Sequence, residues 1–133
     1  MMSLRWLTAS DQKRGCYMLN ITDSLHDDIQ IVHASGKLDT LTAKAFELHL
    51  RKHVDDGQGA LLVDMSGIDY VSSFGLRSLL IIAKQMAPFG RKFVLFSPNP
   101  TVMEVLRVSG FLQIIQVAQD KAEALVMSAG GNG

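Results

Sequence analysis

Residues 60–87 read ALLVDMSGIDYVSSFGLRSLLIIAKQMA, and this stretch decides the fold. Residues 60–65 are apolar except for Asp64, as expected for a central strand that is covered on both faces. Residues 66–73 are mostly polar and predict a loop. An apolar periodicity then predicts a helix over residues 74–87, which a proline and a glycine stop.

Working outward, the same signals predict alternating strands and helices along the rest of the chain. In order, they are a strand at 17–25, a strand at 29–35 broken by Gly36, a helix at 42–54 capped by Thr40 or Thr42, the strand and helix above, a strand at 93–96, a helix at 102–108 capped by Thr101, a strand at 114–117 and a helix at 120–127. The alternation implies parallel strands with right-handed crossovers, and the first two strands form an antiparallel hairpin. The predicted fold class is α/β, with a mixed sheet of four to five strands flanked by about four helices.

Length and composition limit the function. The 133 residues predict one domain, 1–133, with a core at about 16–127 and flexible termini. Lys plus Arg and Asp plus Glu are equal at 13 each, so no charge excess favours nucleic acid or an anionic membrane. The apolar run at 79–83 is too short to span a bilayer, and no signal peptide is predicted. The lone Cys16 fits a buried thiol in a reducing cytoplasm.

Catalytic motifs are missing from the sequence. It contains no phosphate-binding loop and no dinucleotide fingerprint. Ser73 begins a strand-to-helix turn like that of a hydrolase nucleophile, but Val71 stands where that motif requires glycine. His49 and His53 have a metal-binding spacing, yet no Glu follows His49 and no third ligand is evident. We therefore expect no enzyme, no metal site and no cofactor, with both histidines on a half-solvated helix face.

Three carboxylates, Asp39, Asp64 and Asp69, follow or end predicted strands. Because the carboxyl ends of parallel strands gather at one edge, we expect them to meet near the start of helix 74–87. Ser72 and Ser73 would join them there. This group is either a functional cluster or an ordinary set of turn and cap residues.

Helix 74–87 carries two apolar stripes. The core stripe consists of Leu76, Leu79, Leu80, Ala83 and Met86. The second stripe consists of Phe74, Ser78 and Ile81 or Ile82. A helix that is apolar on two faces is either sandwiched within its own fold or exposes a docking patch.

Residues 62–80, LVDMSGIDYVSSFGLRSLL, resemble the signature of STAS domains. That pattern is a buried strand ending in Asp, an aromatic or apolar pair, then Asp-Ser-Ser/Thr-Gly-Leu and a helix. Residues 36–40, GKLDT, resemble the family's Gly-x-Leu-Asp turn, and residues 102–111 resemble its helix ending in glycine. The resemblance extends over about residues 16–127 and is to the anti-sigma factor antagonists within this family.

The resemblance implies a non-enzymatic binding module controlled by phosphorylation. The serine after the motif's Asp, here Ser73, would be modified by a serine kinase that is also the anti-sigma factor. Unphosphorylated protein would bind that kinase and release the sigma factor, and a metal-dependent phosphatase of the PP2C type would reverse the modification. The family's Asp is replaced by Ser72 here, which makes Ser72 a second candidate acceptor.

The implied partner surface is formed by the loops around this serine. Its residues are Asp39, Thr40, Ser72, Phe74, Arg77, Ser78 and Ile81. The expected protein is cytoplasmic, a monomer or weak dimer, with no cofactor and no nucleic-acid or membrane partner. The alternative is a STAS scaffold that binds its partner constitutively in a sensory or transporter-associated complex.

Overall fold

A computed structural model describes residues 19–57 and 59–129, which form one five-stranded sheet in the order β1-β2-β3-β4-β5. Strand β1 is antiparallel to β2, and the remaining neighbours are parallel. The elements are β1 Asn20–His26, β2 Ile29–Leu38, α2 Ala43–Asp56, β3 Leu61–Val71, α3 Ser73–Met86, β4 Phe93–Phe96, α4 Pro100–Val108, β5 Gln116–Ala118 and α5 Lys121–Ala129. The predicted fold class and element order are confirmed. Cys16, the predicted flexible N-terminus and residues 130–133 lie outside the described residues, whereas Ser128 and Ala129 of the predicted flexible C-terminus belong to α5.

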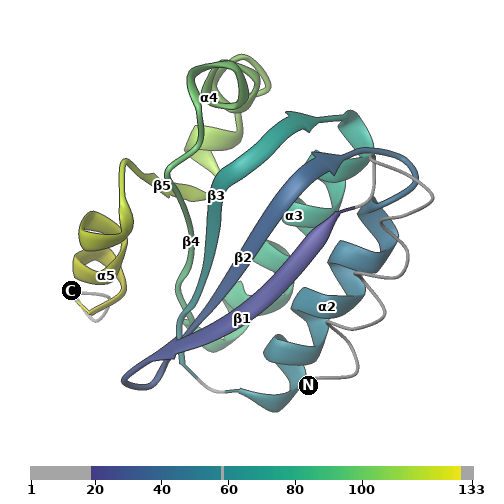
Figure 1. Cartoon of the computed structure of the whole chain (residues 1–133). Coiled ribbons are helices and arrows are strands. Elements are labelled where there is room, and N and C mark those ends of the chain that lie inside the picture. Colours follow the sequence, from purple (N-terminus) through teal and green to yellow (C-terminus); the bar gives the residue numbers. More distant parts are fainter. Residues whose placement is uncertain (1–18, 58, 130–133) are drawn as a thin grey trace.

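The core has two layers, one on each face of the sheet. Helices α2 and α3 lie side by side on one face, and α5 lies on the other (Figure 1). The larger cluster joins strand residues such as Val32 and Val63 to Phe46 of α2 and Ile82 of α3. The smaller cluster buries alternate strand residues, Ile31 and Leu62 among them, together with Ala124 of α5. Central strands that are apolar on both faces are therefore explained by helices on both sides.

Strands β2 and β3 are longer than predicted. Gly36 was expected to break β2, but the strand continues to Leu38 with Gly36 at a φ of 116°. The predicted loop at 66–73 was also wrong, because β3 continues to Val71 and pairs with the extension of β2. The register shifts between His33 and Ser35 and again between Gly36 and Lys37, so bulges obscure the two-residue alternation.

Three element starts also differ from prediction. Helix α4 is capped by Asn99, whose Oδ1 accepts from the Val102 amide at 2.8 Å, and not by Thr101. Thr42 occupies the N-cap position of α2, but its hydroxyl makes no capping bond and donates to the Lys37 carbonyl at 2.7 Å. The last strand begins at Gln116, later than the predicted 114.

Candidate functional site

The start of α3 is fastened to the end of β2. Ser72 is the N-cap of α3, and its hydroxyl accepts from the Gly75 amide at 3.3 Å. The Ser72 amide donates to the Leu38 carbonyl at 2.8 Å. The hydroxyl and the amide of Ser72 are therefore engaged in the local structure, and the loop after β2 is held beside the first turn of α3.

Gly75 allows this close approach. A Cβ built on Gly75 would lie 2.7 Å from Cγ of Leu38 and 2.8 Å from its carbonyl oxygen. Contacts that short would force the first turn of α3 away from β2. Glycine is needed here for space, because its backbone is helical.

Ser73 is the first residue of α3 and is exposed to solvent. The first turn of the helix holds no acidic residue. Backbone amides at a helix N-terminus lack partners within the helix, and the helix dipole is positive there. The position of Ser73 therefore suits an anionic group on its hydroxyl.

Asp39 lies in the loop between β2 and α2, at the same edge of the sheet as Ser72. Its Oδ1 accepts from the amides of Leu41 and Thr42, at 3.0 and 3.2 Å. The carboxylate thus organises the turn that leads into α2. The sequence left open whether Asp39 was a functional carboxylate or a turn residue, and these contacts give it a turn role.

Three large apolar side chains are exposed at this edge. Phe74 in the first turn of α3 is 50% exposed, Tyr70 near the end of β3 is 51% exposed, and Leu41 beside Asp39 is 74% exposed. The sequence prediction included Phe74 but missed Tyr70 and Leu41. An apolar side chain within a turn, where no core can cover it, was the available signal for Leu41.

The predicted docking stripe on α3 needs correction. Ser78 is buried between α3 and α2, and its hydroxyl donates to the Ala43 carbonyl at 3.2 Å. Ile82 is fully buried in the core, and Ile81 is only partly exposed. Of the remaining predicted partner residues, Thr40 and Arg77 are exposed. The part of α3 that is open to a partner is therefore its first turn.

The expected meeting of three carboxylates at this edge was also wrong. Asp69 is exposed near the end of β3, but Asp64 lies seven residues before that end, about 20 Å away at the rise of a strand. There, the Asp64 carboxylate accepts from Nδ1 of His33 at 2.8 Å, and Nε2 of His33 contacts the Ser24 hydroxyl at 2.9 Å. Strand β3 was longer than the sequence suggested, which separated Asp64 from the loop.

Charge and burial compete at Asp64. Burial by itself would raise the pKa of the carboxyl. Hydrogen bonds from His33 and Ser66, with the charge interaction with His33, outweigh burial and leave the pKa of Asp64 below the ordinary aspartate value.

The Ser24, His33 and Asp64 contacts have the order of a hydrolytic triad, but their surroundings do not suit acyl transfer. The three residues project from the face of β1, β2 and β3. Backbone amides of paired strands lie in the plane of the sheet and bond to neighbouring strands. They cannot point at an oxyanion above that face. The contacts therefore fit a hydrogen-bonded chain that crosses three strands.

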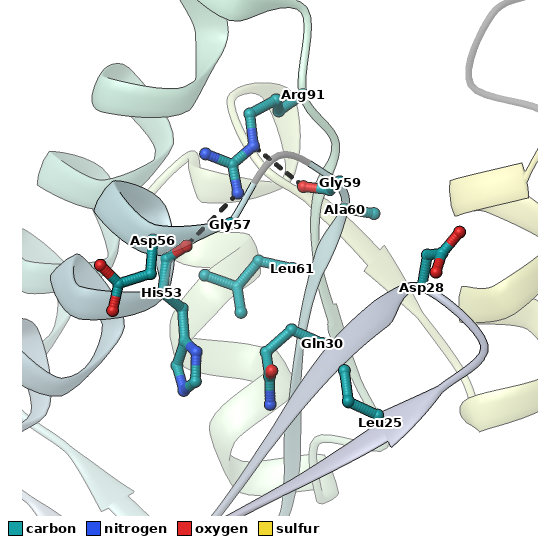
Figure 2. A pocket seen from close by; sticks show the side chains of 10 residues that line it. All are labelled: Leu25, Asp28, Gln30, His53, Asp56, Gly57, Gly59, Ala60, Leu61 and Arg91. Carbon is teal, nitrogen blue, oxygen red and sulfur yellow. Dashed lines mark hydrogen bonds between the residues drawn. The ribbon is translucent and has the colours of Figure 1, made fainter.

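A small cavity of about 180 Å³ lies at the other end of the parallel strands, near the starts of β2 and β3 (Figure 2). Arg91 closes one side of it, donating to the carbonyls of Gly59 at 2.9 Å and Val54 at 2.7 Å. Arg91 thus donates to a carbonyl in the last turn of α2 and to another in the loop after it. Its contacts are with the protein's own backbone, which favours a structural role.

Comparison with known proteins shows a similarity to one domain family. A family model described as the STAS domain matches residues 20–124. BtrV of Bordetella bronchiseptica, a candidate anti-sigma factor antagonist by its name, is 34% identical over 106 residues, covering 80% of this chain and 91% of BtrV. Within the described residues, no helix is long and apolar enough to cross a membrane.

Solved structures share the fold. A candidate anti-sigma factor antagonist from Thermotoga maritima matches with a TM-score of 0.78 at 23% identity, over 82% of this chain and 94% of that one. The anti-sigma factor antagonist SpoIIAA in its unphosphorylated form matches with a TM-score of 0.69 at 17% identity, over 83% and 96% of the chains. The phosphorylated form of SpoIIAA from Bacillus matches with a TM-score of 0.61 at 15% identity, over 79% and 96%.

The fold and site together define an α/β domain that presents the exposed start of one helix as its candidate contact surface. The matched family model and the similarity to BtrV show which group this is. The chain belongs to the STAS domain family.

Proposed function

We propose that this protein is an anti-sigma factor antagonist, and that phosphorylation of Ser73 controls its binding to an anti-sigma factor that is also a serine kinase. The observation that carries the proposal is the contrast between two adjacent serines. Ser73 is exposed at the start of α3, whereas the Ser72 hydroxyl is engaged in the helix cap. A kinase could reach Ser73 without disrupting the cap. The names of BtrV and SpoIIAA, and the existence of SpoIIAA in two phosphorylation forms, support the same role.

The modified protein would remain folded. A phosphate adds about two negative charges at neutral pH. On Ser73 these charges would lie beside free amides at the positive end of the α3 dipole, where anions are favoured. The phosphate therefore changes the surface and leaves the fold intact.

A bound partner would experience the opposite effect. A kinase surface packed on Phe74 and Leu41 would have to desolvate a dianion next to apolar groups. Asp39, held in the adjoining loop, adds like charge nearby. A loss of about 2.7 kcal/mol would weaken binding about a hundredfold, which is enough to exchange partners. A metal-dependent phosphatase of the PP2C type would reset the switch, which operates in the cytoplasm.

The test is phosphorylation by the candidate serine kinases encoded in the same genome. The protein and each kinase are incubated with ATP, and the product is measured by intact and peptide mass spectrometry. We expect one phosphate on Ser73 and none on Ser73→Ala, while Ser72→Ala remains a substrate.

Two outcomes would contradict the proposal. Labelling that persists in Ser73→Ala and disappears in Ser72→Ala would assign the acceptor to Ser72. Tight binding to a partner with no phosphate transfer from any of the kinases would favour a constitutive STAS scaffold in a sensory or transporter-associated complex.

A further inference from the structure

Helix α2 contacts the edge strand β1 through three potential metal ligands. His49 and His53 lie one turn apart on α2, and both direct Nε2 at the same atom, Oδ1 of Asp23 in β1. The distances are 2.7 Å from His49 and 3.1 Å from His53. No third ligand was evident in the sequence, but the structure brings Asp23 within hydrogen-bonding distance of both rings.

The three ligand atoms already lie close to a metal-binding arrangement. They are all within 4.8 Å of one another. Zinc bonds of 2.0–2.2 Å to histidine nitrogen and carboxylate oxygen place tetrahedral ligand atoms about 3.3 Å apart. The nitrogen-to-oxygen distances would need to lengthen by about 0.6 Å from His49 and about 0.2 Å from His53. Small rotations of side chains can supply such a change.

We propose that Asp23, His49 and His53 form a binding site for a divalent transition metal, with zinc as the fitting ion. One carboxylate oxygen accepts hydrogen bonds from both rings only if each Nε2 carries a proton. When zinc binds, each ring must present an unprotonated Nε2 to the metal, so a neutral ring carries its proton on Nδ1 instead, and a doubly protonated ring releases the Nε2 proton to water. Two neutral imidazoles and one carboxylate are a common zinc ligand set.

The three ligand side chains differ in solvent exposure. The side chains of His49 and His53 are 13% and 21% exposed, whereas Asp23 is 37% exposed. The histidines are therefore held by the fold, and the fourth coordination position faces solvent. A water molecule, or a side chain of another protein, completes the tetrahedron.

The metal would join parts of the chain that are 26 and 30 residues apart. It would fasten the edge strand β1 to α2, which packs on one face of the sheet (Figure 1). In Figure 2, the His53 ring points away from Arg91, although His53 also lines the cavity. The site is also separate from Ser73, so this proposal and the phosphorylation switch succeed or fail independently.

Calorimetry on tag-free protein tests the proposal. The protein is treated with chelator, exchanged into chelator-free buffer and titrated with Zn²⁺. We expect one equivalent to bind with a dissociation constant below about 10 μM. Saturating zinc should raise the melting temperature by about 5 °C or more. Cobalt should bind at the same site and give the intense visible absorption of a tetrahedral centre.

Matched variants identify the ligands. His49→Gln, His53→Gln and Asp23→Asn should each weaken zinc binding at least about tenfold. His26→Gln, at the last residue of β1, should bind zinc like the unchanged protein. Cys16→Ser should also bind normally, which separates the site from the thiol. Melting without zinc confirms that each variant is folded.

Absence of saturable zinc binding would overturn the proposal and leave the cluster as a hydrogen-bonded link between β1 and α2. Zinc binding that survives in all three ligand variants, or that is lost in Cys16→Ser, would place the metal elsewhere and also overturn it.

Discussion

Asp39 combines two roles that the choice of substitution can separate. Its carboxylate oxygen accepts two backbone amides in the turn before α2, and its charge lies at the edge of the sheet that carries Ser73. An asparagine keeps an oxygen in the same place but removes the charge. An alanine removes both.

We expect Asp39→Ala to lower the free energy of unfolding by about 1 kcal/mol, because two turn amides lose their acceptor. Asp39→Asn should stay within about 0.5 kcal/mol of the unchanged protein. Urea unfolding measures both. If the charge contributes to kinase recognition, both variants should bind the kinase more weakly in calorimetry. Full binding by the Asn variant would show that Asp39 serves the turn alone.

Gly75 marks the place where α3 closely approaches the end of β2. A glycine within a helix normally lowers helix stability, by about 1 kcal/mol relative to alanine. Here, that cost accompanies the approach of α3 to Leu38, where a Cβ would lie 2.7 Å from the leucine side chain. The motif suggested that glycine belonged at this position, but only the packing explains why.

At the scale of elements, α3 divides into an exposed start and a core-facing body. Phe74 is 50% exposed in the first turn, whereas Ile82, two turns later, is fully buried. The two residues belonged to one predicted apolar stripe. The exposed fraction of each side chain shows that Phe74 is available to a partner and that Ile82 belongs to the core.

Phe74→Ala should therefore unfold near the temperature of the unchanged protein but bind the kinase at least about tenfold more weakly, about 1.4 kcal/mol. Phe89→Ala is the matched control, because Phe89 is 73% exposed just beyond the other end of α3. It should change neither property. Thermal melting and calorimetry make the comparison. A large drop in melting temperature for Phe74→Ala would assign that ring to the core.

The sequence predicted the order of strands and helices well, and their lengths less well. Apolar runs such as 60–65 and 93–96 indicated buried strands, and the helix ends were marked by proline and glycine. The continuation of β3 through Ser66–Val71 was missed because its outer half mixes exposed polar residues with buried ones. The pairing partner that holds this half in the sheet is the end of β2. Local sequence does not contain that information.

At the scale of the whole molecule, the features that the sequence could not predict are contacts between distant segments. Asp23 meets His49 and His53 only because β1 folds back beside α2. The chain of Ser24, His33 and Asp64 forms only because three strands are adjacent in the sheet. The sequence showed the His, Asp and Ser residues, but which of them lie in contact depends on the order of the strands and helices in the fold.

This cross-strand chain links the stability of the sheet to pH. The pKa of Asp64 is lowered in the folded protein, so the unfolded chain takes up the proton first as the pH falls. The contribution of the charged carboxylate is complete above the unfolded value of about 3.9. It disappears as the pH falls through the lower folded value. Acid should therefore weaken the attachment of β3 to β2 through this pair.

Urea unfolding of the unchanged protein and of Asp64→Asn, between about pH 7 and about pH 2.5, tests this linkage. We expect the unchanged protein to be more stable at neutral pH and to lose that advantage progressively below about pH 4. His33→Gln removes the ring that donates to Asp64, so it should show a shallower acid dependence than the unchanged protein. A difference between the unchanged protein and Asp64→Asn that stays constant across this range would show that the carboxylate gains nothing from His33 on folding. The pair would then be a steric contact between neighbouring strands, without electrostatic consequence for the sheet.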